Sequence, residues 1–341
     1  MFESATPIAL FQHQAALLRL HLPGLLDGRP DSIHDARIAT RRIREVLPLT
    51  HEWQRRRDAD DLSARITELG RSLGRARDAD VRIELLRYFE TRLPHAASSL
   101  ALVRQRQERD RLMLARRLVK RIERLGVGEE LARLSAWQRR RFWVAMTGAW
   151  RHQLRQLVAA RAQAAGAAVV HATGVYFPNR SHAARIAIKK FRYAVEISGH
   201  TGLLTDQPPL RTLKNAQDLL GELHDRQTLI DELTDVAGRP EVDAAQIEQV
   251  VRVAEAEIDD LHARVLARRA DVLDICQRVL RKLDRRVITK GAYAVAGVVA
   301  LAAGIEATRR YQTPRPGTVD AEPAGVVLVR VPVLLPDART R

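Results

Sequence analysis

The chain has 341 residues, a formal net charge of +16 and a sequence pI near 10.9. So large a positive charge points to an anionic partner. Aromatic residues make up only 4% of the chain, which argues against proteins that stack single-stranded bases on aromatic rings. The single cysteine, Cys276, excludes an internal disulfide and agrees with a reducing cytoplasm.

Few glycines and prolines and abundant Ala, Leu, Arg and Glu predict an all-α chain. Several of the expected helices are long, which favours antiparallel bundles. In chain order, apolar periodicity predicts helices over 6–21, 32–47, 59–73, 78–93, 97–125, 130–164, 179–199, 209–221, 225–237 and 242–285.

One basic helix occurs twice. The segment 34–44 is matched by 182–192, an offset of 148 residues. Positions i, i+3, i+7 and i+10 of a helix lie within roughly 80° of one another. These positions hold His34, Arg37, Arg41 and Arg44 in the first copy and His182, Arg185, Lys189 and Arg192 in the second.

Each copy therefore pairs a cationic stripe with an apolar back, where Ile43 and Phe191 are expected to face a core. Like charges along a stripe repel one another unless acids or a polyanion neutralise them. Because the stripe is basic at matched positions in both halves, we expect the two copies to build one anionic site.

A second block repeats in nearly the same register. Leu73–Asp78 matches Leu220–Asp225 at an offset of 147 residues. The two blocks together indicate halves of about 148 residues, over about 5–165 and 166–286. In each block a Gly stands four residues before an Asp, which predicts that one helix stops at the Gly and that the Asp caps the next helix; a simple turn is the alternative.

These motifs resemble the CHAD domain, the conserved histidine α-helical domain. The resemblance rests on both basic helices, on Leu73–Asp78, on Arg192-Tyr193-x-x-Glu196 and on the run from Lys214 to Asp225, and it covers roughly residues 5–285. It implies an all-α domain over 1–286, with two pseudo-symmetric antiparallel four-helix bundles and a basic central channel that binds inorganic polyphosphate without catalysis. The residues that it implies for the channel are His34, Arg37, Arg41, Arg42, Arg44, His182, Arg185, Lys189, Lys190, Arg192, Tyr193 and Lys214.

Two other functions stay open. Duplex DNA could be bound through phosphate contacts alone. A Mg²⁺-dependent enzyme that processes polyphosphate could use the pair Asp78 and Asp80, although the second half offers only Asp225. His34 and His182 could contact the ligand, pack the bundles or bind a metal. We expect no enzyme activity, no cofactor and no metal, because no nucleotide-binding loop, triad or zinc motif is visible.

The tail, 287–341, lies outside the resemblance. Its segment 291–305 has no charged residue, is rich in Ala and Gly and is shorter than the roughly twenty residues that span a bilayer. This segment could contact a membrane, the domain itself or the surface of a polyphosphate granule. The Pro-rich end is expected to be disordered or an interaction strand. Met1–Leu22 has no secretory pattern, so we expect a cytoplasmic protein.

Overall fold

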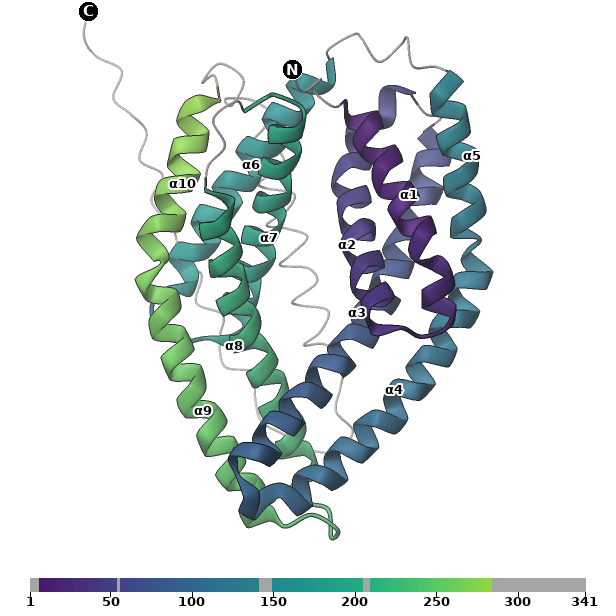
Figure 1. Cartoon of the computed structure of the whole chain (residues 1–341). Helices are drawn as coiled ribbons and strands as arrows, with labels where there is room; N and C mark the ends of the chain where they lie inside the picture. Colours follow the sequence, from purple (N-terminus) through teal and green to yellow (C-terminus); the bar gives the residue numbers. More distant parts are fainter. Residues whose placement is uncertain (1–5, 54–55, 141–148, 205–208, 284–341) are drawn as a thin grey trace, which may run out of the picture. The chain divides into compact units, whose positions relative to one another are not determined.

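The computed structural model describes residues 6–53, 56–140, 149–204 and 209–283, and within these ranges it is all-α without strands (Figure 1). The predicted all-α class is confirmed for this part of the chain. The α-helices are α1 (Pro7–Leu26), α2 (Pro30–Val46), α3 (Arg56–Arg92), α4 (Ala97–Leu125), α5 (Val127–Arg140), α6 (Ala149–Ala172), α7 (Pro178–His200), α8 (Leu210–Val236), α9 (Ala244–Ala267) and α10 (Arg269–Lys282). Two 3₁₀ turns, η1 (Leu47–Trp53) and η2 (Pro94–Ala96), lie between them.

The predicted helix breaks at Gly74 and Gly221 are wrong. Helix α3 runs through Gly74 and α8 runs through Gly221. The reason is that the buried apolar residues keep a helical spacing on both sides of each glycine. In α3 the buried apolar residues are Leu62, Ile66, Leu69, Leu73, Ala76, Ala79, Ile83, Leu86 and Phe89. A continuous buried stripe outweighs the roughly 1 kcal/mol that one interior glycine costs a helix.

Other predicted boundaries also shift. The helix predicted to start at residue 32 begins at Pro30, whose fixed φ suits the first helical position. The helix predicted over 242–285 is two helices separated at Arg268. The helix predicted over 130–164 is described as α5 and α6, and the connection between them lies outside the described residues.

The helices pack in two groups (Figure 1). In the first group α2 and α5 pack on α1, and α3 packs on α2, α4 and α5; in the second, α7 packs on α6 and α8, while α9 packs on α8 and α10 on α6. The groups meet where α2 contacts α7, α3 contacts α8 and α4 contacts α9. All the described residues belong to one compact unit, Met1–Gly297.

The basic helices α2 and α7 are held by their apolar backs, as predicted. Ile43 and Phe191 are fully buried, and Ile33 and Ile188 lie in the same core. Burying each large apolar side chain contributes about 1.5–3 kcal/mol. This burial fixes the rotation of both helices, so their cations are directed away from the cores.

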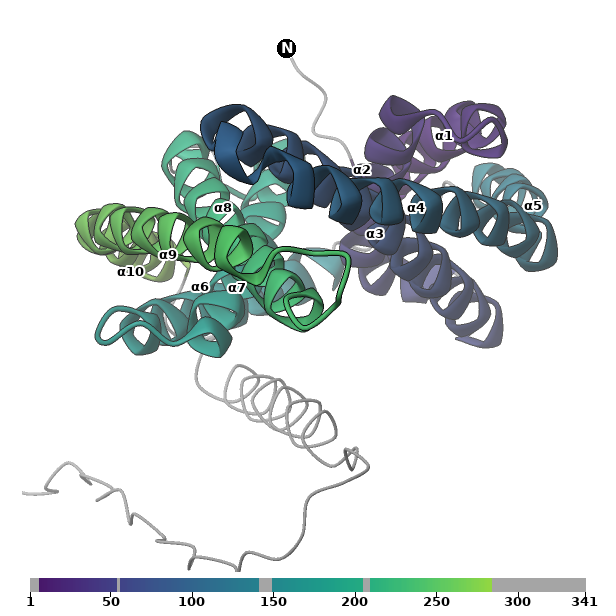
Figure 2. The ribbon, with the colours of Figure 1, turned by 90° about the horizontal axis from the view of Figure 1, so that it is seen from below.

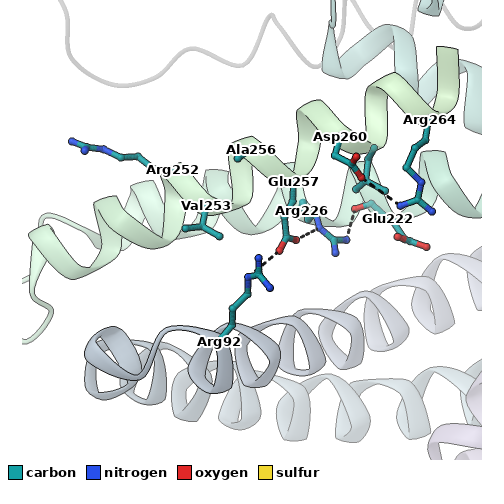
Figure 3. Close-up of a pocket in the computed structure, with 10 residues that line it drawn as sticks. Arg92, Glu222, Arg226, Arg252, Val253, Ala256, Glu257, Asp260 and Arg264 are labelled. Atoms are coloured by element: carbon teal, nitrogen blue, oxygen red, sulfur yellow. Dashed lines mark hydrogen bonds and ion pairs between the residues drawn. The ribbon is translucent and has the colours of Figure 1, made fainter. Parts of the chain in front are cut away.

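The two groups are also connected by an ion-pair network around Glu257 of α9 (Figure 3). Glu257 accepts hydrogen bonds from Tyr88 (2.7 Å) and Arg226 (2.6 Å), and Arg92 lies 3.6 Å away. The hydrogen bond that Tyr88 donates to this carboxylate raises the pKa of Tyr88. Since the network joins α3 to α8 and α9, it helps to fix the position of one group against the other.

Candidate phosphate-binding site

The cations of α2 and α7 gather where these two helices meet. Lys189 feels the charges of Arg41, Arg185, Arg37 and Lys190, which come from both helices. Burial and then these four cations lower the pKa of Lys189 to about 7. We call these five residues the α2–α7 cluster. Burial disfavours the charged form of this lysine, and the neighbouring cations add to that effect, so positive charge is concentrated around Lys189.

Arg37 is a half-buried arginine of the cluster. Its side chain is 18% exposed and lies 3.4 Å from Asp78 of α3. Burial, followed by the charge of Arg41, lowers the pKa of Arg37 to about 10, whereas Asp78 raises it. Asp78 therefore offsets only part of the positive charge around Arg37.

The second half places a similar set around Arg185. Burial raises the pKa of Asp225 on α8, and the charge of Arg185 opposes that rise. Burial and Arg185 also lower the pKa of His224, so this imidazole favours its neutral form. The ring of His224 lies against the ring of His182, with centroids 4.4 Å apart.

Gly221 allows Arg185 to lie over α8. A methyl group at this position would stand 3.5 Å from Nε of Arg185, and a longer side chain would occupy the space of the guanidinium. At Gly74, the matching position of α3, a methyl group would meet no atom within 4 Å. Both glycines thus sit in mid-helix, and of the two only Gly221 is a position where an added methyl group would touch another side chain, at an ordinary van der Waals distance.

A second, partly neutralised pair of cations lies farther along the two helices. Glu196 of α7 is 3.5 Å from Arg42 of α2 and also pairs with Arg192. Arg192 donates to Gln217 of α8 at 3.2 Å and stacks on Tyr193, its guanidinium carbon 4.8 Å from the ring centre. Arg42 and Arg192 are therefore less available to a ligand than the α2–α7 cluster.

The remaining predicted site residues lie apart from these contacts. His34, Arg44 and Lys214 are exposed, and Lys214 is 3.4 Å from Asp218 on its own helix. Tyr193 is buried, so its ring serves as a support for Arg192. The structure thus brings together five of the predicted cations, links two others through Glu196 and leaves three predicted residues at the surface.

Sequence reasoning missed His224, Asp225, Glu196 and Gln217 as neighbours of the cations. The signal was present, because His224 and Asp225 belong to the repeated block of α8. Once that block is one continuous helix, positions 217, 221, 224 and 225 lie on adjacent turns of one face. The expected helix break at Gly221 concealed this shared face.

The predicted carboxylate pair of a magnesium site is divided between two partners. Asp78 faces Arg37 of α2 at 3.4 Å, whereas Asp80 accepts from Arg111 of α4 at 2.6 Å. Residues two apart on a helix point to different sides. The geometry therefore gives both carboxylates arginine partners on different helices.

A comparison with family models matches the CHAD domain over residues 9–234. The chain belongs to the CHAD domain family. The resemblance inferred from the two basic helices is thus confirmed, and the matched range contains the whole α2–α7 cluster together with Gly221, His224 and Asp225.

Solved structures share this CHAD fold. The crystal structure of the CHAD domain from the plant Ricinus communis has a TM-score of 0.53 and 21% identity, covering 82% of this chain and 93% of that one. PptA from Streptomyces chartreusis has a TM-score of 0.51 and 16% identity, covering 82% of this chain and 100% of that one. The comparison with curated proteins gives no match. At these identities the similarity establishes the fold alone.

Proposed function

We propose that this CHAD domain protein binds inorganic polyphosphate at the α2–α7 cluster, as a non-catalytic binding module. The observation that carries the proposal is that the half-buried Lys189 lies among four other cations of α2 and α7; burial first, and then these charges, lower its pKa to about 7. Holding such charges together costs stability in the absence of an anion. A ligand with closely spaced negative charges along a flexible chain offsets that cost over several residues at once.

The surroundings of the cluster favour polyphosphate over nucleic acid. Bases bound in single strands usually stack on exposed aromatic rings. Tyr193, the aromatic residue beside the predicted cations, is 4% exposed and covered by Arg192. A ligand without bases needs no such platform, whereas duplex DNA remains the alternative that uses phosphate contacts alone.

Matched arginine and aspartate neighbours support the idea that the two halves serve one ligand. Arg37 lies beside Asp78 in the first half, and Arg185 lies close enough to Asp225 to oppose its pKa rise in the second. These residues are related by the offsets of the two repeated blocks. Two bundles related by a pseudo-two-fold axis around a shared basic channel would bring an arginine of one repeated block close to an aspartate of the other in each half.

The arginine partners of Asp78 and Asp80 favour a binding role over a Mg²⁺-dependent enzyme, because each carboxylate already balances a cation.

For the location in the cell, we propose the cytoplasm, at the surface of polyphosphate granules. Among the helices of the described ranges, none combines the length and the apolarity of a membrane span. Segment 291–305 lies outside those ranges.

A competition titration tests the proposed ligand. Long-chain polyphosphate is titrated against the full chain at two salt concentrations, with duplex DNA of equal total charge as competitor. We expect polyphosphate to bind tightly and DNA to leave it bound, because the cluster is half-buried between two helices. Displacement by DNA at equal charge would instead indicate a generic basic surface.

The two mid-helix glycines offer a matched pair of variants. We expect Gly221→Leu to weaken polyphosphate binding about ten-fold, because the new side chain displaces Arg185, and one charged hydrogen bond is worth about 1.5–3 kcal/mol. Gly74→Leu, where a methyl group meets no atom, should bind like the unmodified protein. If calorimetry gives equal affinities for both variants, Arg185 does not contact the ligand.

A further inference from the structure

The outer face of α4 carries cations that the proposed site does not use. Leu102, Arg106, Arg109, Met113, Arg116 and Lys120 follow one another in steps of four and three residues and are all exposed. Such steps keep one face of a helix, over about 27 Å of its length. We call these six residues the α4 stripe. In Figure 2, α4 crosses the view beside α3, the helix on which its buried face packs.

The arginines on the other faces of α4 differ from those of the stripe. Arg104 lies 2.7 Å from Glu90, Arg111 lies 2.6 Å from Asp80, and Arg121 pairs with Glu68. Within the described ranges, by contrast, no cation of the stripe has a carboxylate within ion-pair distance, and neither does the exposed Arg117 beside it. The inward arginines hold the helices together, and the outward ones are available to a partner.

Large apolar side chains are interleaved with these cations. Leu102 is 42% exposed, Met113 is 47% exposed, and Leu112, which flanks the stripe, is 63% exposed. A purely ionic partner such as polyphosphate or a duplex backbone leaves these side chains in water. A partner that combines negative charge with apolar surface covers both kinds of residue.

A groove of about 550 Å³ adjoins the stripe, between α4 and the turn from α8 to α9. Leu102 and Met113 line it together with the buried Val103, Val236 and Val242. Arg106, Arg109 and Arg239 stand among the lining residues, with Asp110 and Glu241 as the acids. Apolar lining residues beside three arginines suit an acyl chain whose phosphate headgroup is held by the arginines.

We propose that the α4 stripe and this groove form a docking surface for an anionic phospholipid membrane. Charge complementarity sets the partner's sign, and the interleaved apolar side chains select a lipid surface over a polyanion. Attachment of this kind is peripheral, with the helix lying along the headgroups. It is independent of polyphosphate binding, because the α2–α7 cluster lies on other helices.

Vesicle sedimentation of the full chain tests the proposal. The probe is vesicles of phosphatidylglycerol and phosphatidylcholine, with phosphatidylcholine alone for comparison. Each cation near an anionic membrane strengthens binding about five-fold, so Arg109→Gln with Arg116→Gln should weaken it about 25-fold. Leu112→Gln with Met113→Gln should weaken it about ten-fold, and this loss should persist at high salt, where the effect of charge is screened.

The matched control is Arg252→Gln with Arg278→Gln, which removes the same charge from exposed positions of α9 and α10. We expect the control to bind vesicles within two-fold of the unmodified chain. Stripe variants that sediment like the unmodified chain overturn the proposal and assign attachment to another segment. Loss of duplex-DNA binding in the stripe variants, without vesicle binding by the unmodified chain, would make the stripe a nucleic-acid surface.

Discussion

Replacing Arg37 and Arg41 by alanine will lower the affinity for polyphosphate about 100-fold, and replacing Arg185 and Lys189 will lower it by a similar factor. Each pair lies on one helix, α2 or α7, and each contributes half of the α2–α7 cluster. The measurement is isothermal titration of the full chain with long-chain polyphosphate at fixed salt. The prediction rests on the proposed function.

The expected size follows from two opposing effects. One charge-assisted contact with a phosphate is worth about 1.5–3 kcal/mol, so two lost contacts would cost more than 100-fold. Removing two cations also relieves the repulsion that lowers the pKa of Lys189 or Arg37 in the remaining half. The surviving cations then hold their protons more firmly, which returns part of the affinity.

The control for both pairs is the α9 and α10 double variant with Arg252 and Arg278 changed to alanine, which has the same change in net charge. That variant should bind polyphosphate within about two-fold of the unmodified chain. If either cluster pair also binds normally, the two halves do not share a ligand. A loss in only one pair would place the site on a single helix.

The two repeated basic helices, 34–44 and 182–192, show what a sequence predicts well. Spacing alone predicts that Ile43 and Phe191 lie on the apolar back of each helix, and both are fully buried. Such a prediction succeeds because a helix has one period, so residues that share a face can be read directly from their numbers.

The same periodicity could not fix which glycines end a helix. Gly126 does end α4, in a left-handed conformation with φ of 54°. Gly221 and Gly74 lie inside helices, although they resemble Gly126 in local sequence terms. The difference is tertiary, because buried stripes run on through α3 and α8, and Arg185 lies over Gly221. Single-sequence propensity contains neither effect.

The sequence also could not predict which cations pair with a carboxylate. The basic residues of the cassettes were equivalent in sequence, yet Glu196 neutralises Arg42 and Arg192, while Arg37 and Lys189 lie among other cations. That distinction depends on distances across 154 residues of chain between Arg42 and Glu196. It decides which predicted residues are available to a ligand.

Binding of polyphosphate will weaken about 50-fold between pH 6 and pH 9. In the free protein burial and the four facing cations hold the pKa of Lys189 near 7, and a bound polyanion raises it. The bound form therefore takes up a proton between these two pKa values, and the affinity falls about ten-fold per pH unit in that window. The internal phosphates of the chain keep their charge throughout this range.

The groups around Lys189 set the sign and the edges of this effect. Arg37 and Arg41 face it from α2, and Arg185 and Lys190 lie on its own helix. His224 of α8, near Arg185, has a lowered pKa and adds proton uptake only at the acidic end of this pH range.

The stability of the free protein should change with pH in the opposite direction to the affinity, since an unfolded lysine holds its proton up to a higher pH. Stability without ligand therefore rises as the pH passes from 7 toward 10.5, the ordinary pKa of lysine.

Two variants separate Lys189 from its neighbours. Lys189→Arg keeps the cation at every pH, so binding should stay tight and lose most of its pH dependence. Lys189→Gln should also flatten the profile, at an affinity close to that of the unmodified protein at pH 9. Calorimetry in buffers of different ionisation enthalpy counts the protons taken up at pH 8, with nearly one expected for the unmodified chain and none for either variant. Proton uptake that survives Lys189→Gln would assign the linkage to His224 or Asp225, and the lowered pKa of Lys189 would then have no part in binding.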